Sequence, residues 1–386
     1  MDAPIIVAGA GPGGLAAGVA LARVGRPVLV LERAPQLRVA GAALTIQINA
    51  MQMLSALGLD GAVREAGEVI VSGRIDTHRG RSMATLALGE AAARLGQSSV
   101  AIHRAALSKI LASALPERAI RFDAELVGFE DDGEGVQVRL ASGEALRGSA
   151  LIGADGIHSR VRAALLGEEA PRYAGYTCWR GISALPRPRG AGVVGQLWGP
   201  GIRFGFAPIG PEATYWFATQ NAARGGEDGG DVRAELRERF EGFASPVAEL
   251  LEATPVESIL RNDIIDRPPA SKWVRGRAAL LGDAAHAMTP NMGQGACQAI
   301  EDAVALAEQL SAAASVEAGL LGYESARVER ARRFVNRSWR TGAVVQSSNP
   351  LVCGMRNLRA GLSSDASLMA GMMWAWEVDA PQLRAS

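Results

Sequence analysis

The sequence predicts an α/β protein in which a Rossmann-like nucleotide-binding domain carries an inserted antiparallel sheet. Three observations support this fold class. An apolar run at residues 5–8 leads directly into a glycine-rich turn and a helical pattern. A second apolar run, at residues 278–281, leads into Gly282 and Asp283. Between them, residues 173–265 combine aromatic and β-branched runs with turn signals, a pattern typical of antiparallel strands.

Residues 5–32 have the pattern of a strand, a phosphate-binding turn, a helix and a second strand. Gly9, Gly11 and Gly14 form G-x-G-x-x-G in the context that this motif requires, after a strand and at the start of a helix. Gly9 permits the tight turn, Gly11 lets a pyrophosphate approach the backbone, and Gly14 lets the helix pack on the strand. Glu32 ends the second strand, where its carboxylate would accept hydrogen bonds from a ribose and repel a 2′-phosphate. This segment predicts an ADP-containing cofactor, either FAD or NAD, and excludes NADP as that first nucleotide.

Composition narrows the class of protein. The 386 residues carry 40 basic and 40 acidic side chains, so no electrostatic footprint for nucleic acid is present. Cys178, Cys297 and Cys353 are far apart, which predicts neither a disulfide framework nor a metal site and favours a reducing compartment. No apolar run is long enough to span a membrane, and the first predicted strand begins too early, at Ile5, for a cleavable signal. We therefore expect a cytoplasmic protein without a metal.

Two stretches between these motifs carry charged candidates. Residues 102–104 precede a helical pattern, so Arg104 is either a clamp on a phosphate or flavin, or a surface arginine at a helix start. The apolar run at residues 150–154 ends in Asp155, and a strand that ends in an acid often delivers it to a site at the carboxyl edge of a sheet. The alternative for Asp155 is a capped turn.

The second glycine-rich stretch, residues 282–295, has the pattern of a cradle for a planar ring. Gly293 and Gly295 lack side chains, so a ring could lie on this backbone, and the following helix presents partial positive charge. Asp283 is placed to hydrogen-bond a polyol that links the ring to a pyrophosphate. His286 is either an acid or base, or a residue that holds the loop.

Three segments together resemble the single-component, FAD-dependent aromatic hydroxylases, also called group A flavoprotein monooxygenases. They are residues 9–14, 155–162 and 282–290, which occur in the family's order and at wide separations. Residues 176–182 look most like the branch that contains zeaxanthin epoxidases, urate hydroxylases and salicylate-type hydroxylases. The resemblance implies an FAD-binding domain with an inserted substrate domain, as in para-hydroxybenzoate hydroxylase.

The resemblance also implies positions for the cofactor. Glu32 and Arg33 would meet the adenosine end of FAD, and Arg104 would meet the flavin linker. Asp155 would lie on the pyrophosphate side and meet a transient NAD(P)H, and Asp283 would bind the ribityl chain. The segment from Pro290 through Gly293 to Gly295 would line the isoalloxazine ring. No second G-x-G-x-x-G lies between a predicted strand and a predicted helix, so the nicotinamide would bind only transiently.

The implied reaction is the family's. NAD(P)H reduces FAD, O2 adds at flavin C4a, and the hydroperoxide hydroxylates or epoxidises an aromatic or polyene/quinolone-type small molecule. Arg203, beside Phe204 and Phe206, is a candidate to pair with an anionic or phenolate-like ring, and Tyr215 is a candidate to hydrogen-bond it. The alternative for Arg203 and Tyr215 is a purely structural position.

The predicted organisation divides the chain into five segments. Residues 1–72, 99–170 and 269–386 form the FAD-binding domain with the C-terminal helices, and residues 73–98 and 171–268 form the substrate domain. Residues 120–146 alternate like an antiparallel meander. Residues 367–378 are an apolar run, interpreted as a helix packed on the body or else as a contact with a greasy substrate or a membrane surface.

Other functions are compatible with the first motif alone. A flavin-dependent halogenase needs a Trp-x-Trp-x-Ile-Pro signature, whereas Trp374-Ala375-Trp376 continues here as Glu377-Val378. An FAD-dependent reductase or oxidase, including one that reduces isoprenoid double bonds, would insert no oxygen, and a non-catalytic protein would only hold its dinucleotide. For the monooxygenase, the expected partners are O2 and one apolar or aromatic substrate, and the expected state is a monomer or homodimer.

Overall fold

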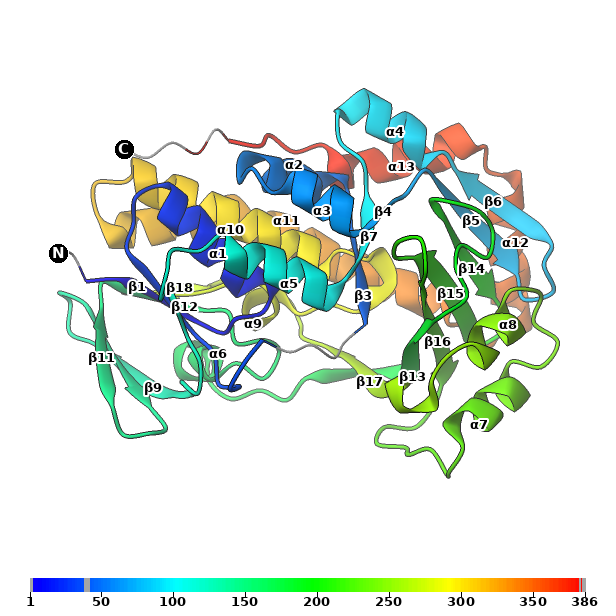
Figure 1. Ribbon diagram of the computed structural model, residues 1–386, viewed down its shortest axis with the longest axis horizontal. Helices are drawn as coiled ribbons and strands as arrows, with labels where there is room; N and C mark the ends of the chain where they lie inside the picture. Colours follow the sequence, from blue (N-terminus) through cyan, green and yellow to red (C-terminus); the bar gives the residue numbers. More distant parts are fainter. Residues whose placement is uncertain (1–2, 38–41, 382, 384–386) are drawn as a thin grey trace.

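The computed structural model describes residues 3–37, 42–381 and 383 (Figure 1). A six-stranded sheet with its helices occupies one end of the molecule, and a seven-stranded sheet occupies the other (Figure 1). The first sheet has the order β18 (Val274–Arg275), β19 (Ala278–Leu280), β12 (Ala150–Gly153), β1 (Ile5–Ala8), β2 (Val28–Leu31) and β8 (Ile120–Arg121). All neighbours are parallel except β18 and β19. Every residue of β1 is buried, as its uninterrupted apolar run requires when helices cover both faces.

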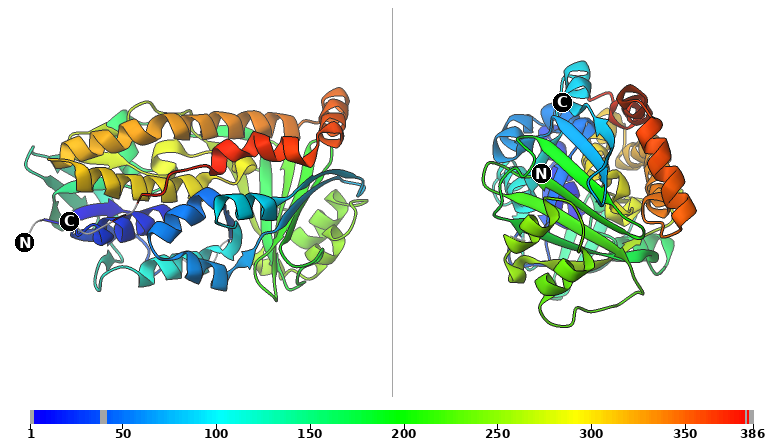
Figure 2. Two further views of the ribbon diagram at one scale, coloured as in Figure 1. Left: turned by 90° about the horizontal axis from the view of Figure 1, so that it is seen from above. Right: turned by 90° about the vertical axis from the view of Figure 1, so that its right-hand side faces the viewer.

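Helices pack on this sheet and on one another around it. They include α1 (Pro12–Arg23), α2 (Ile48–Ala56), α3 (Asp60–Ala66), α5 (Arg104–Ser113), α6 (Arg160–Leu166), α9 (Asp283–His286) and α10 (Gly295–Ala312). A Cβ on Gly13 of α1 would stand 2.8 Å from the Cβ of Ala299 of α10, so the glycine permits their close contact. The long helix α11 (Val316–Val345) reaches from this region to the other sheet (Figure 2).

The seven-stranded sheet is antiparallel with one exception. Its order is β17 (Leu260–Asp266), β13 (Arg172–Ser183), β16 (Thr214–Asn221), β15 (Ile202–Pro208), β14 (Val193–Trp198), β5 (Ser72–Thr77) and β6 (Ser82–Leu86). β14 and β5 pair in parallel. Trp179, Phe204 and Trp216 are buried on one face against α7 (Val232–Arg239) and α8 (Val247–Glu252), so the opposite face of the sheet turns toward the helices of the first region.

Two small sheets complete the strands. One consists of β9 (Leu126–Asp131), β10 (Val136–Leu140) and β11 (Ala145–Gly148), and the other of β3 (Ala43–Ile46), β7 (Val100–His103) and β4 (Glu68–Val69). The meander predicted for residues 120–146 was wrong at its start, because β8 leaves it and joins the parallel sheet with Ile120 opposite Val30. The division of the chain into five domain segments stays a prediction.

Helix α13 (Asp365–Trp376) lies over the junction of the two regions, in contact with α2 and β6, and α4 (Leu88–Leu95) packs against α13 and β5. Helix α12 (Pro350–Leu362) packs against β6 and α11. The short 3-10 turns are η1 (Val256–Ser258) and η2 (Pro290–Met292). Met369, Ala375 and Trp376 of α13 are buried, as expected for a helix packed on the body. Within the part of the chain that the structure describes, no helix is both long and apolar enough to cross a bilayer.

A buried ionic network ties α9, α10 and α11 together. Asp302 of α10 lies 2.5 Å from Nε2 of His286 and accepts hydrogen bonds from Nε of Arg327 (2.7 Å) and the Gly282 amide (3.1 Å). Glu301 accepts from Nη1 of Arg327 at 2.6 Å. Burial alone would raise the pKa of Asp302, but His286 and Arg327 outweigh it through charge and hydrogen bonding and lower the pKa to about 2. His286 therefore belongs to the support of the Gly282 turn.

The network should make the free energy of unfolding depend on pH in the acidic range. In the wild type, the lowered pKa of Asp302 stabilises the fold above the ordinary value of 3.8, and about 2 kcal/mol is lost as the pH falls toward 2. At neutral pH, Asp302→Asn should lower the free energy of unfolding by about 3–5 kcal/mol, because Arg327 and His286 lose a buried partner. Urea unfolding from neutral to strongly acidic pH measures both effects. The exposed control Glu241→Gln should show neither, and an unchanged acid dependence in Asp302→Asn would contradict the assignment.

Candidate cofactor and substrate site

Four candidate residues meet at one edge of the six-stranded sheet. Gly9 follows β1, Glu32 follows β2, Asp155 comes two residues after β12, and Asp283 comes three residues after β19. Because these strands are parallel, their carboxyl ends lie along the same edge, which is where open α/β sheets bind ligands. The structure thus brings together residues that the sequence separates by more than 250 positions.

The three motif glycines serve different ends. A Cβ on Gly14 would stand 1.9 Å from the carbonyl oxygen of Gly9, and Gly9 itself has φ +108°, so packing and backbone geometry require both. Gly11 has φ −71°, and its Cβ would meet no atom of the described residues within 4 Å. Packing within the protein does not account for glycine there, whereas its place as the N-cap of α1 and the close approach of a bound group both would.

Two carboxylates flank this turn. Glu32 accepts hydrogen bonds from the amides of Ala10 (3.0 Å) and Ala34 (2.9 Å). Asp155 Oδ2 accepts from the amide of Arg160 at 2.8 Å, so Asp155 does cap the start of α6. Its buried Oδ1, however, has no hydrogen-bond partner among the residues that the structure describes, and burial raises the pKa of the carboxyl group. A turn cap uses only one of the two oxygens and leaves the other for a ligand.

The loop at residues 290–295 is held from outside. The side-chain amide of Gln47 donates to the carbonyls of Met292 (2.8 Å) and Gly293 (3.1 Å), and Trp376 of α13 donates to Gln47 Oε1 at 2.8 Å. Gly293 has φ +63°, which favours glycine. The loop therefore depends on two segments that the sequence pattern did not connect with it.

The remaining cofactor candidates are open to solvent. Asp283 is exposed, and its Oδ1 lies 3.9 Å from where a Cβ on Gly295 would stand, so these two candidates are neighbours. Pro290 is also exposed. The side chains of Arg33 and Arg104 are exposed, with Arg104 at the first position of α5.

Arg203 lies on the face of the seven-stranded sheet that turns toward this loop. It is buried, and its Nη2 donates to Oδ1 of Asn291 at 2.9 Å. Asn291 in turn donates from Nδ2 to the hydroxyl oxygens of Tyr176 (3.0 Å) and Thr289 (2.9 Å). Burial lowers the pKa of the Arg203 guanidinium, and its Nε has no partner among the described residues. Arg203 thus joins the sheet to the loop through Asn291.

Tyr215 is on the same face, but the structure does not bring it next to Arg203. Arg203 pairs with Thr219 and Ala207 pairs with Tyr215, so the two candidates are four residues apart along the strands, about 13 Å. Tyr215 is opposite Ile182, one pair beyond Arg180 and Phe217 on the same face. Burial raises the pKa of Tyr215, opposed by the nearby charge of Arg180, so the phenol stays protonated at neutral pH.

Apolar side chains fill the junction between sheet, loop and α13. One hydrophobic cluster includes side chains from all three, namely Val194, Ala207, Ile209, Met288, Met292, Met372, Met373 and Trp374. Most of these are only partly buried, and methionine adapts its shape readily to what it contacts. The junction therefore offers an adaptable apolar surface with the polar groups of Arg180 and Tyr215 nearby on the sheet.

Sequence reasoning missed Gln47, Asn291 and Arg180. Asn291 follows Pro290 directly, so its place in the predicted ring loop was a usable signal. Arg180 alternates with Cys178 and Ile182 along a predicted strand, which indicates a shared face but not which face meets the loop. Gln47 carried no signal, because its partners are 245 and 246 residues away.

The fold and this site define a class: a flavoprotein whose dinucleotide lies along the carboxyl edge of the parallel sheet. The open position at Gly11, the unpaired oxygen of Asp155 and the supported loop at Gly293 fit such a group. Residues 2–338 match the family model described as "FAD binding domain", and the chain belongs to this family.

Similar proteins support the same class. Aurachin C monooxygenase/isomerase of Stigmatella aurantiaca is 46% identical over 362 residues, which cover 94% of each chain. Chloroplastic zeaxanthin epoxidase of Solanum lycopersicum is 39% identical over 84% of this chain, which spans only about half (52%) of that protein. The crystal structure of Klebsiella pneumoniae HpxO with FAD and uric acid superposes with a TM-score of 0.90 at 30% identity, covering 96% of this chain and 95% of that one. The predicted fold class, the FAD cofactor and membership of the flavoprotein monooxygenases, which typically use NAD(P)H, are confirmed.

The glycine motif provides a test that separates ligand contact from packing. Gly11→Ala should weaken FAD binding by about 10- to 100-fold, because a methyl group would occupy the space of the bound group, while the melting temperature of the FAD-free protein stays unchanged. Gly14→Ala should lower that melting temperature, because its Cβ overlaps the Gly9 carbonyl. Gly61→Ala in α3, where a Cβ meets no described atom within 4 Å, is the matched control. Normal FAD affinity in Gly11→Ala would remove Gly11 from the site.

Proposed function

We propose that this protein uses NAD(P)H and O2 to hydroxylate or epoxidise an apolar aromatic substrate of quinolone type. The observation that carries the proposal is the apolar junction of sheet, loop and α13, where partly buried methionines meet the face that bears Arg180 and Tyr215. The 46% identity to an aurachin C monooxygenase/isomerase supports the same substrate class. Polyenes remain the second candidate, supported by the zeaxanthin epoxidase relatives.

The cofactor would be held along the carboxyl edge. We assign the pyrophosphate to Gly9, Gly11 and Gly14, and the pyrophosphate side with the transient NAD(P)H to Asp155. The adenosine end is assigned to Glu32 and Arg33, the flavin linker to Arg104, and the ribityl chain to Asp283. The ring is assigned to Pro290, Gly293 and Gly295. Bound FAD supplies the transfer of electrons from NAD(P)H and the activation of oxygen. The protein's own share is to support the ring loop through Gln47 and Asn291 and to keep water out with the apolar junction.

Arg203 and Tyr215 would act on the substrate in different ways. The protonated phenol of Tyr215 is a hydrogen-bond donor for a substrate oxygen, and the charge of Arg180 beside it favours electron density on that oxygen. Arg203 donates to Asn291, so we propose that it sets the position of the sheet relative to the loop. Its unpaired Nε would contact a phenolate-like oxygen of the substrate.

The setting of the protein is also part of the proposal. We infer a cytoplasmic location, supported by the three free and buried cysteines, Cys178, Cys297 and Cys353. A monomer or homodimer is the proposed state.

Product analysis tests the function. Purified FAD-loaded protein is incubated with NADH or NADPH and with aurachin C, zeaxanthin or uric acid, while oxygen uptake and product mass are followed. We expect aurachin C to stimulate NAD(P)H oxidation and to yield a product heavier by one oxygen atom. Preferential turnover of uric acid would contradict an apolar substrate, and NAD(P)H oxidation without any oxygenated product would favour a reductase or oxidase.

Arg203→Ala tests the position of that arginine. We expect KM for the substrate to rise by about 10- to 100-fold, the range for a lost hydrogen bond to a charged group, while FAD stays bound. Arg239→Ala is the control, because Arg239 stacks on Trp179 on the opposite face of the sheet. Unchanged steady-state kinetics with the true substrate would remove Arg203 from the site, and loss of FAD absorbance would assign it to the loop alone.

A further inference from the structure

Helix α12 presents an apolar stripe to solvent. Leu351, Met355, Leu358 and Leu362 are 77%, 65%, 62% and 77% exposed, and their spacing places them on one face over about 16 Å. Ten large hydrophobic side chains are exposed among the described residues, and four of them lie on this helix. The opposite face of α12 packs inward through Cys353 and Arg356. The helix is therefore amphipathic, with its apolar side outward.

The surrounding segment carries a concentrated positive charge. Residues 331–364 contain six arginines and no lysine, aspartate or glutamate, although the whole chain has equal numbers of basic and acidic residues. Arg332, Arg333, Arg337, Arg340 and Arg359 are exposed. Because these 34 residues include no acidic side chain, the segment has a positive charge, although the whole chain has no net charge.

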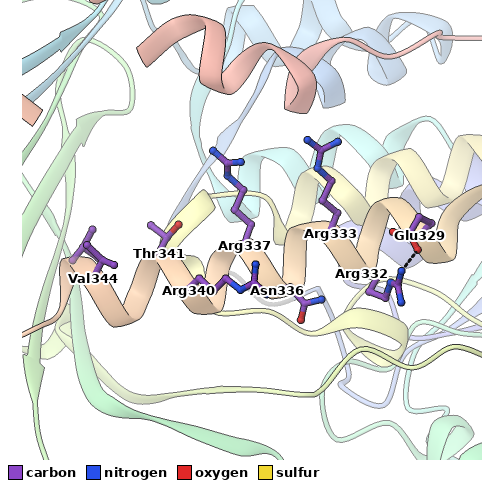
Figure 3. Close-up of a pocket in the computed structure, with 9 residues that line it drawn as sticks. Glu329, Arg332, Arg333, Asn336, Arg337, Arg340, Thr341 and Val344 are labelled. Carbon is purple, nitrogen blue, oxygen red and sulfur yellow. Dashed lines mark ion pairs between the residues drawn. The ribbon is translucent and has the colours of Figure 1, made fainter. Parts of the chain in front are cut away.

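Four of these arginines line one groove on α11. The groove has a volume of about 630 Å³, and its residues are Glu329, Arg332, Arg333, Asn336, Arg337, Arg340, Thr341, Val344 and Val345 (Figure 3). Arg333 and Arg337 extend to one side of the helix, where Arg333 stacks on Trp374 with its Cζ 3.8 Å from the ring centre (Figure 3). Arg332 pairs with Glu329 at 2.6 Å, so the charge is least compensated toward Arg337 and Arg340.

The groove on α11 ends next to the inward side of α12. Val344 and Val345 end the groove, and Arg356 of α12 donates from Nη1 to the carbonyl of Val345 at 2.9 Å. Cys353 adds a hydrogen bond to the carbonyl of Ser347. Figure 2 shows α12 standing at one end of α11, at the edge of the molecule. Exposed cationic and apolar side chains therefore lie on neighbouring parts of α11 and α12. We call the exposed residues of α12 together with Arg337, Arg340 and Val344 the α12 face.

We propose that the α12 face docks on an anionic lipid bilayer. An amphipathic helix lies in the plane of the interface with its apolar side in the acyl boundary, while neighbouring arginines meet lipid phosphates. The four exposed side chains of α12 supply the first contact, and Arg337, Arg340 and Arg359 supply the second. The 13-residue helix is too short to span a bilayer, so it lies along the surface.

Charge complementarity favours a lipid surface over a second copy of this chain. In a twofold dimer the same patch meets itself, which would bring the arginines of one copy against those of the other without an acidic partner. An anionic bilayer instead offers a negative counterpart to every arginine. A membrane contact was one alternative for the apolar run at residues 367–378, but Met369 and Trp376 of that helix are buried, so α13 offers no such apolar face. The exposed apolar face belongs to α12.

Vesicle flotation tests the proposal with the full-length, FAD-loaded protein and without substrate. We expect the wild type to float with vesicles of equal parts phosphatidylcholine and phosphatidylglycerol, and much less with phosphatidylcholine alone. Leu358→Glu with Leu362→Glu should reduce the partition coefficient of the protein between vesicles and water by about 100-fold or more. Arg340→Gln with Arg359→Gln should reduce it by about 30-fold, since each basic residue near an anionic surface contributes about fivefold.

Matched controls keep the outcome clear. Leu321→Glu changes a leucine that is 55% exposed elsewhere on α11, and Arg64→Gln with Arg139→Gln removes two arginines outside the α12 face. Both controls should float like the wild type, and all variants should keep bound FAD and melt normally. Absence of wild-type flotation, or flotation unaffected by the leucine pair, would overturn the proposal. Light scattering without lipid could also overturn it. If the wild type is a dimer that Leu358→Glu with Leu362→Glu converts to a monomer, the α12 face joins two copies of the chain instead. Since binding is measured without turnover, its failure leaves the proposed oxygenation untouched.

Discussion

Parallel pairing of β1 with β2 on one side and β12 on the other is the constraint on which the site depends. It directs three strand ends to a single edge and sets Gly9 between Glu32 and Asp155. The alignment of β19 with β12 adds the turn at Gly282 to the same edge. No local interaction could gather these groups, because each comes from a different part of the chain. Backbone hydrogen bonding between the strands therefore brings the functional groups of the site together at one edge.

Support for this edge comes from buried charge. Asp302 holds the Gly282 amide and the ring of His286, while Arg327 links Asp302 to Glu301. Glu301 also accepts a hydrogen bond from Asn49, next to the segment that holds the ring loop. Buried ions are costly unless each is fully paired, and a network that meets this condition has little freedom to rearrange. It fixes the turn and the loop relative to one another.

The sequence predicted the parts of the fold that are encoded locally. Gly9, Gly11, Gly14 and the acids after each strand could be recognised because strand, turn and helix are adjacent along the chain, and the comparisons confirm the fold class that they indicated. The contributions of Gln47 and Arg180 could not be predicted, because hydrophobic alternation reports which residues share a face and not what that face meets. The parallel pairing of β14 with β5 and the departure of β8 from the predicted meander escaped for the same reason.

The contact between Trp376 and Gln47 has a consequence for biogenesis. These residues are 329 positions apart, yet their hydrogen bond is part of the support for the ring loop. Contacts of such long range form late, because closing a large loop of chain costs entropy before the contact contributes any favourable free energy. During synthesis, the strands and the opening turn can assemble while the ribosome is still adding α10 and α11. The loop acquires its final shape only once α13 has emerged, so flavin capture should be among the last events of maturation.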